Sequence, residues 1–296
     1  MNNTLITYKD LFSWGTNELQ AEKNTSEYES KYLICLLFDI PLKKFDSILN
    51  TKAKNQKLIE KFISTIKKRK KGTPLAYLLN TWFFKEKKYY VDKGVFIPRP
   101  ETERVVNATK NLISEMNYEL TDITILEIGF GTGVISIELA QLYYDLKILS
   151  WDINTQALIN AKKNTTLYKT KNTTFINKDF FEDQKTWGPI IHAEKPVIIV
   201  GNPPYIPNNH IKNLYPIVWQ NEPIDALAGG TKGLDFYIKL FEIASQGKNN
   251  SLVLEFGLNQ ETLLKKIINS YKNKKIHIIS AKKSIPKVLV VKNIYY

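Results

Sequence analysis

The sequence is poor in the residues that form disulfides and metal sites. It has one cysteine, three histidines and two methionines among 296 residues. A disulfide framework is therefore excluded, and little is left for a metal centre, so we expect none. The cysteine, Cys35, lies in the apolar run YLICLLF and is expected in the core. These features fit a protein of the reducing cytoplasm.

Long apolar runs are also missing. No stretch of about 18 consecutive apolar residues occurs, so we expect no transmembrane helix and no membrane partner. The first ten residues, MNNTLITYKD, lack the basic-then-apolar pattern of a signal peptide.

Arginine is scarce, although the formal net charge is +13. It occurs only at Arg69, Arg99 and Arg104, and lysine supplies the remaining positive charge. A basic protein attracts acidic partners such as RNA, ribosomes or acidic proteins. Proteins that read nucleic-acid sequence usually depend on arginine, however, so the charge is weak evidence for such a substrate. The lysine-rich run at 67–71 can equally be a solvated helix end.

The chain divides into three regions of different pattern. Residues 1–72 show apolar side chains at helical spacing, which predicts a small helical domain. Residues 73–97 are rich in aromatic and β-branched side chains with a turn near Lys85–Lys88, which predicts a β-hairpin linker. Residues 98–296 form the third predicted domain.

Strands and helices alternate from about residue 121 onward. Helices are expected after the first two strands and again at 233–246 and 260–270. This alternation predicts an α/β fold with a mostly parallel sheet covered by helices on both faces. Only SAKKSIP lies between the last two strands, which is too short for a helical crossover, so they should pair antiparallel. The expected strands are 123–128, 147–152, 173–177, 197–201, 251–256, 275–280 and 286–292.

A glycine-rich turn follows the first expected strand. It reads Gly129-Phe130-Gly131-Thr132-Gly133 and leads directly into a helix. Such glycines let the backbone approach a ligand closely, above the positive end of the helix. The dinucleotide fingerprint G-x-G-x-x-G is not met, because a valine occupies its last position. The turn therefore favours a nucleoside ligand without a pyrophosphate.

Two residues at the ends of the next strands complete this ligand site. Asp152 ends the second strand, about 20 residues further on, where an acid can accept both ribose hydroxyls. Phe180 follows the third strand and can cover an adenine ring. Because ligands bind at the carboxyl ends of strands in open sheets, S-adenosyl-L-methionine fits this set better than NAD. The alternative is a structural turn beside a solvated aspartate.

The fourth expected strand runs into Asn202-Pro203-Pro204-Tyr205. The prolines end the strand and stiffen the loop. The Asn202 side-chain oxygen and the Pro203 carbonyl can each accept a hydrogen bond from one planar NH2 group, and Tyr205 offers a flat apolar face. Such acceptors hold a nitrogen in line with a methyl sulfonium, so no strong base is needed. The alternative is a proline-rich loop that only ends the strand.

The combined pattern resembles a known family. Asn-Pro-Pro-Tyr after the fourth strand is similar to the motif of methyltransferases that act on planar NH2 groups of adenine, cytosine, guanine or glutamine. Segments 71–103, 221–240 and 254–260, which include FIPRPETE, NEPIDALAGG and LEFGLNQ, resemble the peptide chain release factor glutamine N5-methyltransferases. That family also carries a small helical N-terminal domain.

The resemblance implies a Rossmann-like class I methyltransferase fold with a seven-stranded, mostly parallel sheet whose last strand is antiparallel. It implies methylation of the glutamine in the Gly-Gly-Gln loop of release factors, with S-adenosyl-L-methionine as methyl donor. The helical domain and the hairpin would grip the release factor, and the enzyme would be a monomer that needs no nucleic acid. The cofactor would contact Gly129, Phe130, Gly131, Thr132, Gly133, Asp152, Phe180 and Asn202. The glutamine would contact Asn202, Pro203, Pro204 and Tyr205, of which Asn202, Pro203 and Tyr205 would be catalytic.

Some positions differ from the family pattern. Glu127 replaces the usual aspartate, Phe130 replaces a small residue, and Asn80 stands where the hairpin commonly has glycine. Lysines in AKKSIP replace a Gly-x-Asp-Arg motif. The family motif also includes Arg99, Glu101 and Glu103. The proposed chemistry assigns them no role, and a structural role in positioning the start of a helix is the alternative to a role at the site.

Three other functions share parts of this pattern. A glutamine methyltransferase of a ribosomal protein would have the same cofactor turn and the same Asn-Pro-Pro-Tyr loop. A nucleic-acid methyltransferase must extrude its target base, and scarce arginine argues against it. A binding module without catalysis would not require both motifs in register.

Overall fold

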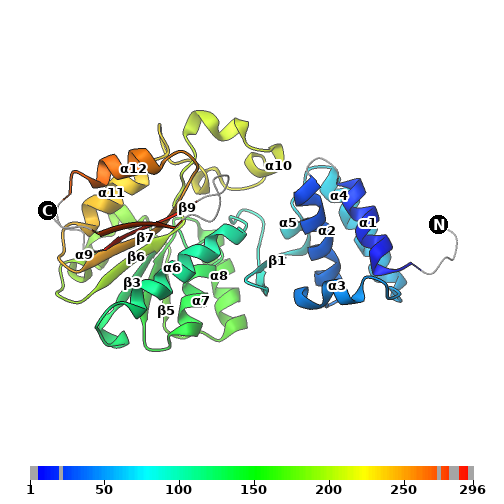
Figure 1. Cartoon of the computed structure of the whole chain (residues 1–296), viewed down its shortest axis with the longest axis horizontal. Helices are drawn as coiled ribbons and strands as arrows, with labels where there is room; N and C mark the ends of the chain where they lie inside the picture. The colour runs from blue at the N-terminus through cyan, green and yellow to red at the C-terminus, as the bar shows by residue number, and fades with distance from the viewer. Residues whose placement is uncertain (1–5, 20–22, 272–274, 280–286, 293–296) are drawn as a thin grey trace.

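The main sheet has the architecture that the alternating pattern predicts. The computed structural model describes residues 6–19, 23–271, 275–279 and 287–292. In this part of the chain, seven strands lie in the order β5-β4-β3-β6-β7-β9-β8 (Figure 1). Neighbours are parallel except for the two pairs that involve β9, so the antiparallel last strand is confirmed. The strands are β3 (Thr124–Ile128), β4 (Lys147–Trp151), β5 (Thr173–Ile176), β6 (Val197–Gly201), β7 (Asn250–Phe256), β8 (Lys275–Ile279) and β9 (Lys287–Lys292).

Helices cover both faces of this sheet, which explains why its central strands are apolar throughout. All five residues of β6, Val-Ile-Ile-Val-Gly, are buried, as is typical of parallel strands covered on both sides. One face carries α6 (Glu103–Ser114), α7 (Val134–Leu142) and α8 (Thr155–Tyr168). The other face carries α9 (Gln184–Ile191), α11 (Asp235–Ala244) and α12 (Glu261–Ile268).

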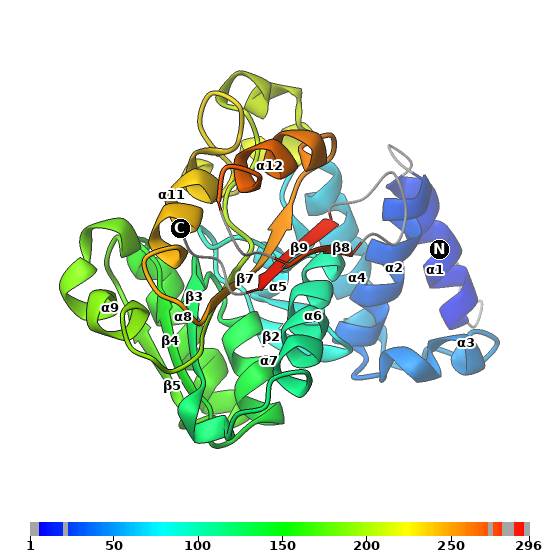
Figure 2. The same ribbon diagram turned by 60° about the vertical axis from the view of Figure 1, so that its left-hand side comes forward.

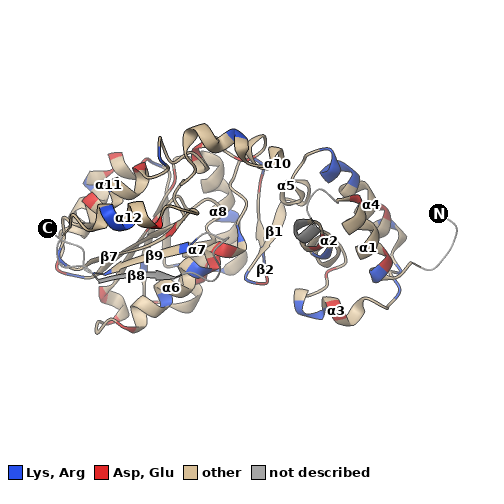
Figure 3. Cartoon of the chain, turned by 45° about the horizontal axis from the view of Figure 1, so that its top comes forward, with Lys and Arg blue, Asp and Glu red and all other residues tan. Residues whose placement is uncertain are grey.

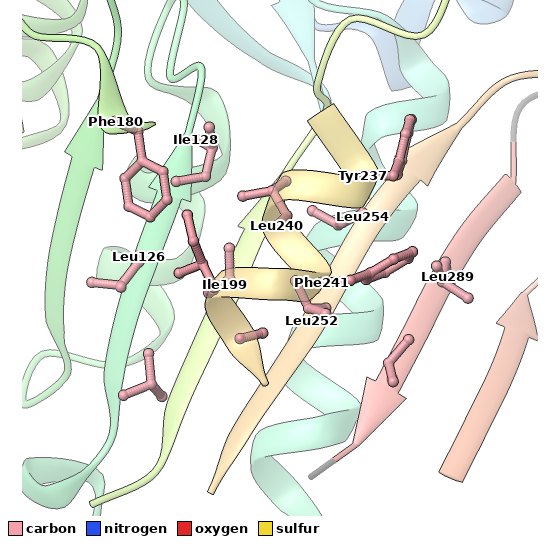
Figure 4. Packing of buried hydrophobic residues seen from close by; sticks show 14 of the residues in the cluster. Leu126, Ile128, Phe180, Ile199, Tyr237, Leu240, Phe241, Leu252, Leu254 and Leu289 are labelled. Carbon is pink, nitrogen blue, oxygen red and sulfur yellow. The ribbon is translucent and has the colours of Figure 1, made fainter. Parts of the chain in front are cut away.

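Side chains alternate between the two faces along each strand. On β3, Leu126 belongs to the hydrophobic cluster under α11, whereas Ile125 belongs to the cluster under α6 and α7. Figure 4 shows Leu240 and Phe241 of α11 lying over the sheet, close to Leu252 of β7. This packing fixes the frame on which the strand ends are held.

The pairing of β3 with β6 brings the glycine-rich turn and the Asn-Pro-Pro-Tyr loop together. Ile128, the last residue of β3, is in register with Gly201, the last residue of β6. A Cβ at Gly201 would lie 2.7 Å from the Ile128 carbonyl oxygen, so only glycine fits this close approach. Both loops therefore leave the sheet side by side.

The N-terminal helices have a hydrophobic cluster of their own. It includes Leu33, Phe45, Phe62 and the free Cys35, all buried, so the core position expected for the cysteine is confirmed. Figures 1 and 2 show these helices beside the sheet-containing part of the chain. They are α1 (Tyr8–Glu18), α2 (Lys23–Leu37), α3 (Phe45–Ile48), α4 (Gln56–Lys70) and α5 (Leu75–Leu79).

A hairpin connects the two parts, as the sequence predicts. Strands β1 (Thr81–Phe84) and β2 (Lys87–Tyr90) pair antiparallel. The turn residues between them, Lys85 and Glu86, both have positive φ, as in the tight turns that match the twist of a hairpin. The hairpin is anchored on α7, where Lys87 and Tyr89 both donate hydrogen bonds to Glu138. The hairpin is thereby tied to the helix that follows the glycine-rich turn.

Charged residues are spread over many elements (Figure 3). The lysine-rich end of α4 is partly neutralised, because Arg69 pairs with Glu29 and Lys70 pairs with Glu18. Across the described ranges, no helix combines the length and the apolar character needed to cross a membrane. The segment 280–286, which contains the lysines in AKKSIP, lies outside the described residues.

Candidate active site

A cavity of about 710 Å³ lies at the carboxyl ends of β3, β4 and β6. Most of the residues expected at the site line it, whereas Gly133 and Tyr205 are not among the described residues that do. The expected residues in its lining are Gly129, Phe130, Gly131, Thr132, Asp152, Phe180, Asn202, Pro203 and Pro204.

The three glycines of the turn have two different roles. All three have positive φ. A Cβ at Gly129 or Gly131 would meet nothing within 4 Å, so these residues leave room for a ligand. A Cβ at Gly133 would lie 3.2 Å from both Ala161 and Phe175, so this glycine allows α7 to pack closely against its neighbours. The expected contact between Gly133 and a cofactor stays a prediction.

Asp152 is held at the cavity by backbone donors. Its carboxylate accepts hydrogen bonds from the amide of Gly131 at 2.8 Å and from the amide of Asn154 at 2.9 Å. Burial raises the pKa of this carboxyl above its ordinary value, although both amides counteract the rise. Asp152 thereby fixes the glycine-rich turn, and it also lines the cavity beside this turn.

The Asn202 amide has a defined orientation. Its Nδ2 donates to the Thr102 hydroxyl at 3.1 Å, and that hydroxyl donates to Glu255 Oε2 at 2.9 Å. No donor among the described residues is paired with Asn202 Oδ1. Because Asn202 lines the cavity, an acceptor for an NH2 group is available there, as the sequence predicts. Thr102 and Glu255 were not predicted, although both lie in the quoted segments FIPRPETE and LEFGLNQ.

Tyr205 does not belong to the described lining of the cavity. Its hydroxyl donates to Glu255 Oε1 at 3.4 Å, and its ring lies against Gly257. Burial raises the pKa of the Tyr205 hydroxyl, which keeps it protonated and able to donate. One edge of the ring packs inside the protein, and a direct contact between Tyr205 and the substrate stays a prediction.

Gln260 fixes the Asn-Pro-Pro-Tyr loop through a hydrogen bond to its backbone. This buried side chain donates to the carbonyl oxygens of Tyr205 at 3.0 Å and Gly233 at 2.9 Å. It also accepts from the Gly257 amide at 2.9 Å. Ile206 is bridged in parallel to Ala228, so two other segments of the chain, 228–233 and 257–260, fix the loop. Sequence reasoning missed Gln260, the last residue of the quoted LEFGLNQ.

Close packing around this loop gives the first testable prediction. Gly233 has a φ of +69°, and a Cβ there would collide with the Tyr205 carbonyl oxygen and lie 2.7 Å from Gln260 Nε2. We expect Gly233→Ala to lower the free energy of unfolding by about 1–3 kcal/mol and to reduce turnover by displacing the loop. Chemical denaturation and initial rates would measure both.

Gly72→Ala is the matched control for this prediction. Gly72 has a φ of +100°, yet nothing lies within 4 Å of its Cβ position. It therefore reports backbone strain without the collision. Equal effects of the two substitutions on stability and turnover would contradict the role of close packing.

Comparisons with known proteins decide the family. A family model described as "Methyltransferase small domain" matches residues 88–219. The release factor glutamine methyltransferase of Dictyoglomus turgidum is 35% identical over 217 residues, covering 73% of this chain and 72% of that protein. The chain belongs to the release factor glutamine methyltransferase family.

Two further relatives extend the match. The release factor glutamine methyltransferase of Aquifex aeolicus is 33% identical and covers 72% of this chain and 73% of its own length. That of Bacillus cereus is 28% identical over 262 residues, covering 88% of this chain and 89% of its own. The enzyme is thus an S-adenosylmethionine-dependent methyltransferase, as the resemblance implied.

A solved structure shows the same fold. The catalytic domain of hMettl16, in complex with MAT2A 3′UTR hairpin 6, has a TM-score of 0.53 at 14% identity, covering 70% of this chain and 76% of that one. At this identity the likeness shows the fold alone, which is that of class I methyltransferases.

The methyltransferase cavity holds an unsatisfied acid that fits the cofactor. Glu127 is fully buried and lines the cavity, and the Ser136 hydroxyl donates to its Oε2. Its Oε1 has no hydrogen-bond partner among the described residues. Burial raises the pKa of Glu127 to about 7. A cationic group such as the ammonium of S-adenosylmethionine would satisfy this oxygen. The sequence signal for this role is an acid just before the glycine-rich turn. From the sequence we identified Glu127 only as a departure from the family pattern, without assigning it a contact with the cofactor.

Phe180 contributes an aromatic ring to the lining of the cavity. Its ring stacks on Trp187 with centroids 5.4 Å apart and meets Trp151 edge-on at 5.2 Å. The ring is therefore held rigidly where it lines the cavity. A rigid aromatic wall fits the adenine expected there.

Two members of the Arg-Pro-Glu-Thr-Glu motif join separate segments of the enzyme. Arg99 forms an ion pair with the buried Glu222, which also accepts from the Ile97 amide at 3.1 Å. Glu103 accepts from the backbone amide of Lys85 at 3.1 Å, which ties the hairpin turn to α6. These contacts support a positioning role for both residues.

Proposed function

We propose that this enzyme transfers a methyl group from S-adenosylmethionine to the side-chain amide nitrogen of the glutamine in the Gly-Gly-Gln loop of peptide chain release factors. The observation that carries the proposal is the Asn202 amide, whose oxygen is unpaired among the described residues and whose nitrogen is tied back to Thr102. The names of the relatives point to the same substrate class.

Asn202 and Pro203 would hold the reacting nitrogen. Asn202 Oδ1 accepts one N–H of the substrate amide, and the Pro203 carbonyl accepts the other. Bonding both hydrogens weakens the delocalisation of the nitrogen lone pair and directs it toward the methyl group. When bound, the cofactor would supply the methyl group on a sulfonium sulfur, which leaves as a neutral thioether when its bond to the methyl carbon breaks. The nitrogen gains one C–N bond and releases one N–H proton to the solvent, so the product amide is neutral.

Residues around the glycine-rich turn would hold the cofactor. Asp152 accepts the ribose hydroxyls, Glu127 accepts from the ammonium group, and Phe180 covers the adenine. Gly129 and Gly131 leave space for close approach. These three contacts and the space at the two glycines use charge and shape that the cavity already has.

The helical domain 1–72 and the hairpin linker 73–97 would grip the release factor beside the domain 98–296 that performs the transfer. The hairpin supports this division, because it packs Phe83 into the helical cluster and Phe84 into the cluster under α6. We further propose that the enzyme acts in the cytoplasm as a monomer and needs no nucleic acid.

Mass spectrometry of a release factor incubated with the enzyme and S-adenosylmethionine tests this function. We expect one methyl group on the Gly-Gly-Gln glutamine. Ribosomal proteins and ribosomal RNA, incubated in parallel, serve as competing substrates. Methylation of one of them with none on the release factor would overturn the proposed substrate.

A further inference from the structure

An acid, a hydroxyl and an amide form one hydrogen-bonded chain that ends at the wall of the cavity, where Thr102 and Asn202 belong to the lining. It runs from Glu255 on β7 through Thr102 to Asn202 in the Asn-Pro-Pro-Tyr loop. Glu255 is 1% and Thr102 4% exposed, so water does not compete for these bonds. The three residues are far apart in the sequence, and the tertiary fold brings them into hydrogen-bonding distance.

The direction of each hydrogen bond in this chain follows from chemistry. An ionised carboxylate can only accept, so the single proton of the Thr102 hydroxyl is donated to Glu255. Thr102 can then only accept from Asn202, which must turn its Nδ2 inward. Asn202 Oδ1 is left on the opposite side of the amide, as an acceptor for the substrate.

We propose that Thr102 and Glu255 are positioning residues that keep Asn202 from presenting its NH2 group to the substrate. The inference rests on the proposed transfer to an amide nitrogen. With Asn202 reversed, two NH2 groups would face each other and neither would have an acceptor. The orientation therefore decides whether the substrate amide is held at all.

The surroundings of Glu255 make this orientation sensitive to pH. Tyr205 donates to its carboxylate, and the Tyr237 hydroxyl donates to its backbone carbonyl at 2.6 Å. The charged neighbours are Glu101, which raises the pKa of Glu255, and Arg104, which lowers it. On β9 its register partner is Val288, which does not titrate.

Burial is the largest of these effects and raises the pKa of Glu255 to about 7. Below that pH the carboxyl binds a proton and can donate to Thr102. The Thr102 proton is then free to point at Asn202, which allows the amide to reverse. We therefore expect kcat to fall as the pH drops through about 7.

Substitution of Thr102 tests the chain directly. Thr102→Val keeps the shape but removes the hydroxyl, and we expect kcat at saturating substrates to fall by about 10- to 100-fold. The dissociation constant of S-adenosylmethionine should change far less. Thr102→Ser restores the hydroxyl and should recover most of the turnover.

Thr109→Val is the matched control, on the helix α6 that begins directly after Thr102. Thr109 is equally buried, and its hydroxyl donates only to the Val105 carbonyl among the described residues. We expect its kcat to equal that of the unchanged enzyme. If Thr102→Val matches Thr109→Val in kcat and in pH profile, the inference is wrong.

Glu255→Gln gives an independent readout if Thr102→Val does not fold, which circular dichroism would reveal. The carboxamide does not titrate, so the fall in kcat at acid pH should disappear. An unchanged acid limb would overturn the inference. Failure of the unchanged enzyme to methylate glutamine would instead refute the proposed function, so the two failures are distinguishable.

Discussion

Asn202→Ala is expected to reduce methyl transfer by about 10²- to 10³-fold, the loss typical of removing one group that stabilises a transition state. In the proposed mechanism, the side-chain oxygen is the acceptor that orients the reacting nitrogen. Alanine removes it without filling the cavity with a new group. Initial rates of transfer to a release factor, measured by mass spectrometry, would show the loss, and circular dichroism would show that the fold is kept.

Asn208→Ala is a suitable control for this loss. Asn208 lies six residues further along the chain, is exposed, and accepts a hydrogen bond from the Gly230 amide at 3.1 Å. It does not belong to the described lining of the cavity. Its removal should leave transfer nearly unchanged. Near-normal activity of Asn202→Ala would refute the mechanism.

Asp152→Ala is expected to weaken the binding of S-adenosylmethionine by about 10- to 100-fold, because hydrogen bonds to a charged group contribute about 1.5–3 kcal/mol each. The substitution would remove the proposed hydrogen bonds from the ribose hydroxyls to the carboxylate. It would also leave the amides of Gly131 and Asn154 without their acceptor. Isothermal titration calorimetry measures the change directly.

Asp152→Asn separates these two effects. The amide oxygen can still accept from one of the backbone amides, so the turn should stay closer to its native form. Its affinity should fall between those of Asp152→Ala and the unchanged enzyme. An unchanged calorimetric affinity in Asp152→Ala would show that the ribose is held elsewhere.

The strands and their edge were predictable because they follow from local pattern. The run Val197–Gly201 is apolar throughout, which is typical of a strand covered on both faces, and it is β6 in the structure. Since parallel strands share one carboxyl edge, Asp152 and Asn202 could be assigned to the same site before their distance was known. The cavity includes both residues.

The sequence by itself determined the sheet, the glycine-rich turn and the places of Asp152 and the Asn-Pro-Pro-Tyr loop at the strand ends, since each depends on neighbouring residues along the chain. Only the tertiary structure decided which residues orient them. Thr102 and Asn202 are 100 residues apart, and Thr102 and Glu255 are 153 apart. The position of Tyr205 also depends on contacts that are distant in sequence. Its hydroxyl donates to Glu255, and its ring packs against Gly257. Local spacing carries no information on such contacts, because they form only when the layers pack.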